Sequence, residues 1–119
     1  MRNQPKYTFF NNTTYALNGL IDIIKTETSF KIELLLGIIL IPFLIYIDLE
    51  CINKVLMFIV MMGVLIAETI NSAIERTVDL VTLEQHPMAG RAKDVGSTIV
   101  LLSIFVFIVV WSLNIYKLF

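Results

Sequence analysis

The chain has 119 residues, of which 57% are hydrophobic and only 16% charged, and its net charge is −1. A soluble domain this small could not bury so much apolar surface, so we expect a single integral membrane domain over residues 1–119. The near-neutral charge, without a basic stripe, argues against a nucleic-acid partner, and the single Cys51 excludes an internal disulfide.

The first predicted element is an amphipathic helix over about residues 12–28. Apolar side chains recur at helical spacing from Tyr15 to Ile24, with polar residues such as Asn18 and Asp22 between them. Low net hydrophobicity with one apolar face suits a helix that lies in the membrane interface. A packed helix of a soluble protein is the alternative, and the strongly apolar segments that follow favour the interfacial interpretation.

Three apolar segments then predict transmembrane helices. They are expected over about residues 30–48, 52–81 and 97–118. The first is short for the ~20 residues that a bilayer needs and contains Pro42, which neighbouring helices can accommodate. Residues 82–96 are expected to form a loop, because Pro87 and Gly90 interrupt helices. The predicted architecture is an all-α membrane protein with one interfacial and three transmembrane helices.

The distribution of basic residues predicts the orientation. Lysines and arginines gather before the first span and between the second and third spans, at Arg2, Lys6, Lys25, Lys31, Arg76, Arg91 and Lys93. With three spans these two regions share a side, which the positive-inside rule makes cytoplasmic. The N-terminus is therefore expected in the cytoplasm and the C-terminus on the opposite side.

A polar stripe emerges from the second apolar segment directly after the run Val55–Ala67. Its members fall on one face of a helix: Glu68, Asn71, Ser72, Glu75 and Asp79. Charged groups near membrane depth are rare and usually functional. Glu68 has the strongest claim, because Glu75 and Asp79 lie toward a helix end where solvated charges are common.

Several carboxylates without a cysteine or histidine cluster suit a hard cation such as Mg²⁺, which usually binds together with nucleotide phosphates. Lys93 could meet those phosphates, and Glu68 could act as a general base. His86 beside Pro87 is more simply a loop histidine, and the chain has no Walker-A or protein-kinase motif.

Two classes of function remain open from these residues. One is an enzyme that acts on a membrane-embedded substrate at the cytoplasmic face. The other is a small oligomeric ion-coupled transporter subunit that uses Glu68. A transport site is expected near the bilayer midplane, whereas these acids gather at one boundary, which favours surface chemistry.

Two blocks together resemble the signature of the bacterial integral-membrane diacylglycerol kinase family. The first runs from Glu68 to Glu75 and continues to Val78 and Asp79, and the second is Gly90-Arg91-Ala92-Lys93-Asp94-Val95-Gly96-Ser97. The segment Glu27–Glu33 also resembles that family's Glu-x-x-Phe-Arg-x-Glu, with lysine in place of arginine.

The resemblance implies a homotrimer in the bacterial inner membrane with composite active sites between subunits. It implies transfer of the γ-phosphate of ATP, with Mg²⁺, to diacylglycerol, giving phosphatidic acid; related enzymes prefer undecaprenol. By matching motifs, Glu68 is the catalytic base, and Glu27 and Glu75 hold the metal. ATP would be contacted by Tyr15, Glu27, Glu75, Glu84, Gln85, His86, Lys93 and Asp94. The lipid substrate would be contacted by Ser29, Phe30, Lys31, Glu33, Glu68, Asn71 and Ser97.

Overall fold

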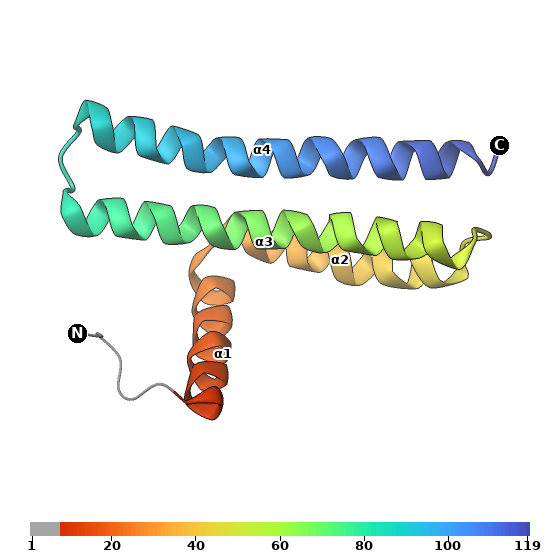
Figure 1. Ribbon diagram of the computed structural model, residues 1–119, viewed down its shortest axis with the longest axis horizontal. Coiled ribbons are helices and arrows are strands. Elements are labelled where there is room, and N and C mark those ends of the chain that lie inside the picture. Colours follow the sequence, from red (N-terminus) through yellow and green to blue (C-terminus); the bar gives the residue numbers. More distant parts are fainter. Residues whose placement is uncertain (1–7) are drawn as a thin grey trace.

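The computed structural model describes residues 8–119, and this part of the chain consists of four α-helices without a strand (Figure 1). They are α1 (Phe9–Thr26), α2 (Thr28–Tyr46), α3 (Cys51–Val81) and α4 (Pro87–Tyr116). The last three are each long and apolar enough to cross a membrane, which confirms the predicted all-α class and its three spans. Arg2 and Lys6, which entered the prediction of orientation, lie outside the described residues.

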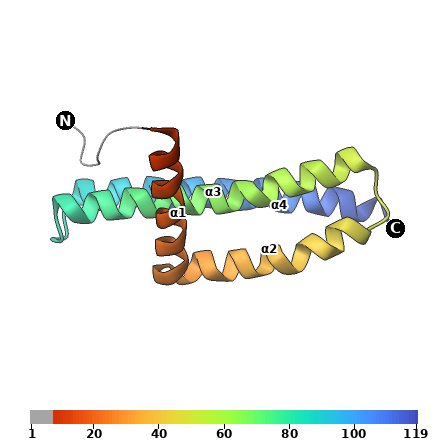
Figure 2. The ribbon, with the colours of Figure 1, turned by 90° about the horizontal axis from the view of Figure 1, so that it is seen from below.

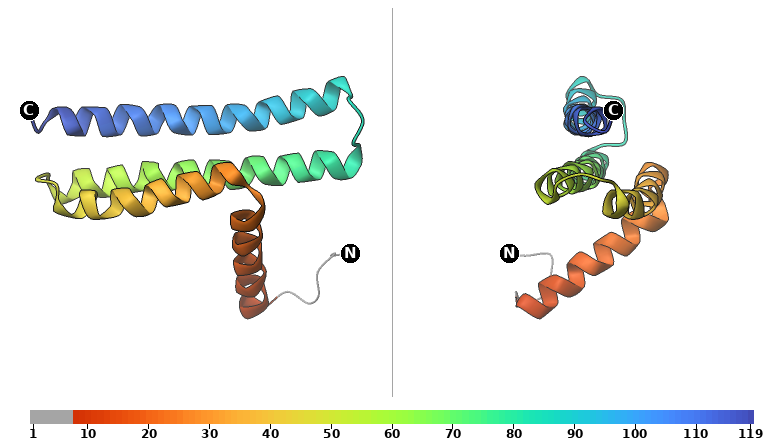
Figure 3. Two further views of the ribbon diagram at one scale, coloured as in Figure 1. Left: turned by 180° about the vertical axis from the view of Figure 1, so that it is seen from behind. Right: turned by 90° about the vertical axis from the view of Figure 1, so that its right-hand side faces the viewer.

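The three long helices lie along one direction, and α1 leaves them almost at a right angle (Figure 2). Helices α3 and α4 run antiparallel side by side, while α2 packs along the first half of α3 (Figure 3). At 1.5 Å per residue, the 31 residues of α3 span about 46 Å, more than the ~30 Å hydrocarbon core. One end of the α3–α4 pair therefore projects beyond the membrane when α2 spans it.

Helix α1 begins three residues earlier than predicted, because the Thr8 side chain caps it by accepting a hydrogen bond of 3.1 Å from Asn11 N. Its apolar residues Leu17, Leu20 and Ile21 are exposed. A helix perpendicular to the spans runs parallel to the membrane plane, where such a face can contact lipid. A single extended residue, Glu27, separates α1 from α2 and makes the corner between them.

The best-packed core lies near the α2–α3 turn, away from α1. It joins Leu44 of α2, Met57 and Met61 of α3 and Trp111 of α4, with Met57 fully buried. The Trp111 indole donates a hydrogen bond of 3.0 Å to the Met57 carbonyl oxygen. Helix α2 continues through Pro42 without interruption, as expected for a proline inside a packed span.

Helix α4 starts at Pro87, so the prediction of a loop over residues 82–96 is wrong from residue 87 onward. Proline is favourable at the first helical position, and the His86 Nδ1 atom accepts a hydrogen bond of 3.1 Å from Met88 N. Gly90 costs a helix only about 1 kcal/mol and does not end it. The connection is reduced to residues 82–86, and Lys93, Asp94 and Ser97 are helical.

Candidate active site

The predicted polar residues gather where α1 branches from the bundle and where α3 and α4 extend past α2 (Figure 1). Four pairwise contacts organise this region. They join Glu33 to Glu68, Asn71 to Glu75, Arg76 to Glu27 and Asp79 to Lys93. Two of the four join different helices and a third joins α3 to the corner between α1 and α2, so the helix packing and the site depend on each other.

Glu33 of α2 and Glu68 of α3 are neighbours across the two helices, and their carboxyl groups interact. Both residues are half-buried, and the Glu33 Oε2 atom is buried without a hydrogen-bond partner in the described part of the chain. Glu33 also lines an apolar cavity of about 350 Å³ between the three long helices. Its other walls include Leu36, Gly37, Leu40, Met61, Leu65 and Phe107. The Glu33 carboxyl group, with Glu68 as its neighbour, therefore borders a space that suits an apolar chain.

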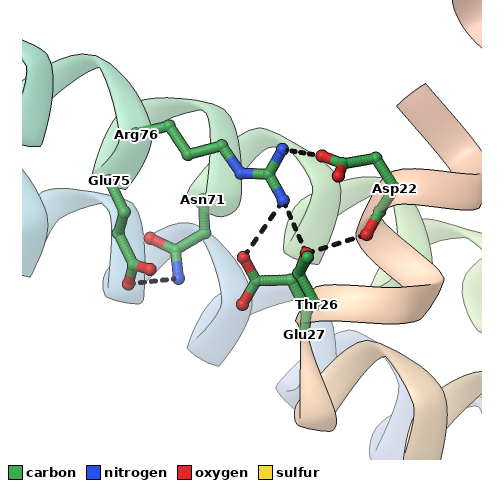
Figure 4. Close-up of polar contacts among 6 residues, drawn as sticks. All are labelled: Asp22, Thr26, Glu27, Asn71, Glu75 and Arg76. Carbon is green, nitrogen blue, oxygen red and sulfur yellow. Dashed lines mark hydrogen bonds and ion pairs between the residues drawn. The ribbon is translucent and has the colours of Figure 1, made fainter. Parts of the chain in front are cut away.

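Asn71 lies between α3 and α4 and orients Glu75. Its Nδ2 atom donates a hydrogen bond of 3.3 Å to Glu75 Oε1, as Figure 4 shows. Its Oδ1 atom is buried without a partner among the described residues and lies against Gly96, where a Cβ atom would overlap it. An unpartnered amide oxygen beside a held carboxylate is a polar arrangement that a ligand can complete.

Glu27, at the corner between α1 and α2, is held from α3 by Arg76. The Arg76 guanidinium donates to the Asp22 carboxylate, to Thr26 Oγ1 at 2.9 Å and to Glu27 Oε1 at 3.5 Å (Figure 4). Sequence analysis gave Asp22, Thr26 and Arg76 no site role. The signal that could have drawn attention to Arg76 is its place directly after Glu75.

The residues predicted to hold Mg²⁺ fit that ion as partial ligands. No group of three or more His, Cys, Asp or Glu side chains within residues 8–119 is placed to hold a metal. Mg²⁺ is commonly bound by one or two carboxylates, with water and substrate phosphates completing the shell. Glu27 and Glu75 supply hard oxygen donors, and Asn71 keeps Glu75 oriented, so the donor chemistry matches a metal that arrives with a nucleotide.

A second polar region surrounds the α3–α4 connection. A cavity of about 510 Å³ is lined there by Asp79, Glu84, Gln85, His86 and Lys93, among others. Lys93 Nζ lies 2.7 Å from Asp79 Oδ1, and both side chains are partly exposed. Asp79, expected from sequence at a helix end where solvated charges are common, is thus the residue that holds the predicted phosphate-binding lysine.

The remaining predicted residues are dispersed. Asp94 and Ser97 lie on a shallow surface of α4 and do not line the cavity that Lys93 lines. Ser29 and Lys31 are exposed on the first turn of α2, whereas Phe30 is buried. Tyr15 is half-buried on α1. One chain by itself therefore does not bring all the predicted nucleotide and lipid contacts into a single pocket.

Comparisons with known proteins identify the family. A model of the family described as prokaryotic diacylglycerol kinase matches residues 14–115. A diacylglycerol kinase of Pseudomonas aeruginosa is 39% identical over 102 residues, covering 86% of this chain and 83% of that protein. The diacylglycerol kinase of Escherichia coli K12 is 34% identical, covering 92% and 98% of the two chains. An undecaprenol kinase of Bacillus subtilis is 30% identical, covering 75% and 72%.

The resemblance seen in the motif blocks is confirmed by these matches, which extend over most of the chain and include every predicted site residue. The relatives named above are enzymes whose acceptors are lipids, and the three apolar helices agree with a multi-pass protein of the bacterial inner membrane. The chain belongs to the prokaryotic diacylglycerol kinase family and is a lipid kinase.

Proposed function

We propose that this enzyme transfers the γ-phosphate of ATP to the free hydroxyl of diacylglycerol and so produces phosphatidic acid. The observation that carries the proposal is the Glu33–Glu68 carboxyl pair beside an apolar cavity between the three long helices. A lipid whose chains occupy apolar space beside these helices would present its hydroxyl near the pair. The names of the relatives from P. aeruginosa and E. coli support the same acceptor.

In this mechanism Glu68 takes the proton from the acceptor hydroxyl as the oxygen attacks the γ-phosphorus, and the bond from the γ-phosphorus to the β–γ bridging oxygen breaks, so that ADP leaves. Glu33 supports Glu68 from α2, since the two carboxyl groups interact. Phosphoryl transfer needs mainly positioning and charge stabilisation from a protein. A bound Mg²⁺ supplies part of that charge stabilisation, and Glu27 and Glu75 are the residues that would hold it.

We assign nucleotide binding to the polar end of the bundle. Lys93 would contact the phosphates, with Asp79 keeping its ammonium in place. Further contacts to ATP are assigned to Tyr15, Glu84, Gln85, His86 and Asp94, and contacts to the lipid to Ser29, Phe30, Lys31, Asn71 and Ser97. Because these residues do not share one pocket in a single chain, we propose a homotrimer with sites completed by a neighbouring subunit.

The positive-inside rule supports an N-terminus in the cytoplasm and a C-terminus in the periplasm. The polar end with Glu68, Glu75 and Lys93 then lies at the cytoplasmic face, where ATP is available. The opposite orientation would separate the nucleotide residues from their co-substrate.

Undecaprenol is a second candidate acceptor, favoured by the match to the B. subtilis undecaprenol kinase. Both lipids offer a primary hydroxyl close to long apolar chains, so the Glu33–Glu68 pair suits either. A side-by-side assay of the purified enzyme with Mg²⁺, ATP and each lipid tests the proposal. We expect phosphatidic acid to form with the higher kcat/KM; a higher value for undecaprenol would reverse the assignment.

The transporter alternative can be tested with the same purified protein. Proton or ion flux in proteoliposomes without ATP, together with no phosphorylation of either lipid, would overturn the kinase assignment. A purified Glu68→Gln variant shows which activity depends on this carboxylate: the kinase assignment expects loss of lipid phosphorylation, and the transporter alternative expects loss of flux.

A further inference from the structure

Arg76 connects three structural elements through one side chain. It extends from α3, and its guanidinium reaches Asp22 and Thr26 in the last two turns of α1 and Glu27 at the corner with α2 (Figure 4). A guanidinium presents several donors in a fixed plane, so three acceptors bound together restrict their relative positions. Its partners are 49 to 54 residues away in the sequence, so the contact is tertiary.

Little else holds α1 against α3. Helix α1 packs mainly on α2, its neighbour in sequence. A groove of about 500 Å³ lies between α1 and α3, with Gly19 and Ile23 on one side and Thr69 and Ser72 on the other, and Arg76 is part of its lining. The orientation of α1 relative to α3 therefore depends strongly on the Arg76 contacts.

Glu27 has no other side-chain partner among residues 8–119 that would fix its carboxylate. It is the one residue between two helices, with extended backbone angles (φ −107°, ψ 109°), and its side chain makes no capping hydrogen bond. Its carboxylate contacts Arg76 Nη2 at 3.5 Å. The position of this carboxylate is thus set from α3.

We propose that Arg76 is a positioning residue: it fixes the corner between α1 and α2 so that Glu27 is presented to the same metal–nucleotide complex as Glu75. This inference rests on the proposed roles of Glu27 and Glu75. Arg76 follows Glu75 directly on α3, and neighbouring residues on a helix point about 100° apart. Arg76 can therefore hold Glu27 without occupying the Glu75 carboxylate.

The energetics favour a role in orientation over one in stability. The side chains of Arg76, Asp22 and Glu27 are 47%, 52% and 32% exposed. Exposed ion pairs contribute little to stability, so removing Arg76 should leave the protein folded. Residues that orient a metal ligand without touching the metal typically change metal affinity by roughly 10- to 100-fold.

The first experiment measures the position of α1 without using activity. Hydrogen exchange of residues 20–27 is followed in the nucleotide-free enzyme for Arg76→Gln, for Arg76→Lys and for Asp22→Asn, which leaves Glu27 untouched. We expect amide exchange in residues 20–27 to be several-fold faster in Arg76→Gln than in the parent enzyme. Arg76→Lys and Asp22→Asn should lie between these two, because each loses only part of the contacts that limit local opening. Lys117→Gln, which removes an exposed positive charge at the C-terminus, is the matched control and should exchange as the parent does.

The second experiment measures binding of a fluorescent ATP analogue as a function of Mg²⁺ concentration. Arg76→Gln should weaken Mg²⁺-dependent binding roughly 10-fold and raise KM for Mg·ATP similarly, while KM for the lipid stays within about 2-fold. Arg76→Lys should recover part of the loss, since lysine keeps the charge but not the planar fork. Asp22→Asn provides a second variant of the same contacts if Arg76→Gln does not assemble.

A double-mutant cycle decides whether Arg76 acts through Glu27. Adding Arg76→Gln to Glu27→Gln should cause no further loss of nucleotide binding, because the group that Arg76 positions is already changed. Additive losses, as expected if Arg76 touches the phosphates directly, or unchanged exchange in residues 20–27 would overturn the proposal. If the parent enzyme binds no nucleotide in a Mg²⁺-dependent way, the proposed function fails, while the exchange measurement still decides whether Arg76 holds the corner.

Discussion

The Asn71 amide oxygen of α3 occupies the place beside α4 where a Cβ atom on residue 96 would lie. Gly96 is buried, and its missing side chain lets the two helices approach with Asn71 between them. The same Asn71 side chain donates to Glu75. The contact between Asn71 and Gly96 therefore links the packing of α3 and α4 to the orientation of a proposed metal ligand.

Gly96→Ala should displace Asn71 and release Glu75. We expect a lower apparent Tm in detergent, corresponding to roughly 1–3 kcal/mol of overpacking, and a loss of kinase activity that exceeds the loss of folded protein. Gly63→Ala is the matched control, because, apart from its chain neighbours and the adjacent backbone of its own helix, no atom of the described chain lies within 4 Å of a Cβ added there. Unchanged Tm and activity in Gly96→Ala would show that Asn71 does not need this space.

Glu68→Gln should nearly abolish turnover, because an amide cannot accept the proton of the acceptor hydroxyl. General bases contribute about 100- to 10,000-fold, so kcat should fall at least roughly 100-fold with the oligomer intact. Glu50→Gln makes the same chemical change at the other end of α3, on an exposed side chain without a capping hydrogen bond, and should retain activity. A near-normal kcat in Glu68→Gln would show that another group is the base.

Composition and apolar segment length were sufficient to predict the fold class and the three long helices, since a membrane leaves few other structures for such a chain. The start of α4 was not predictable in this way. Pro87 and Gly90 end helices in many contexts, but Pro87 stands at the first position of α4, where it is favourable, and Gly90 is carried within the helix. The start of α4 therefore depends on the position of each residue within the helix and not on the residue type alone.

The candidate site was predictable where its residues share one helix and not where helices meet. The spacing of Glu68, Asn71 and Glu75 follows from helical periodicity, and the 3.3 Å contact from Asn71 to Glu75 agrees with it. The contacts of Arg76 with α1 and of Lys93 with Asp79 depend on the angle of α1 and on the return of α4 along α3. Neither the angle of α1 nor the path of α4 along α3 follows from a local sequence pattern.

Asp79→Asn should remove the ion pair that positions Lys93 and so raise KM for ATP several-fold. The effect should be smaller than that of Lys93→Gln, because the lysine charge remains. The physical reason is the 2.7 Å ion pair, which keeps the Lys93 ammonium at the edge of the cavity near the α3–α4 connection. Asp48→Asn removes an exposed carboxylate at the opposite end and serves as the control. Kinetics with varied ATP and fixed lipid measure the effect; an equal rise in KM for the lipid would contradict it.

Trp111→Phe should lower stability without changing the chemistry. The indole loses its 3.0 Å hydrogen bond to the Met57 carbonyl oxygen and leaves a smaller ring among Leu44, Met57 and Met61.

The combined cost of the hydrogen bond and the poorer packing is roughly 1–3 kcal/mol. Met57 lies 11 residues before Glu68, about 16 Å along α3, so kcat of the folded enzyme should be unchanged. Thermal unfolding in detergent, with activity normalised to folded protein, measures both quantities. Tyr116→Phe, on an exposed residue of the last turn of α4, is the control. A lower kcat at unchanged Tm would contradict both expectations. Packing around Trp111 would then affect catalysis about 16 Å away without affecting the stability of the helices.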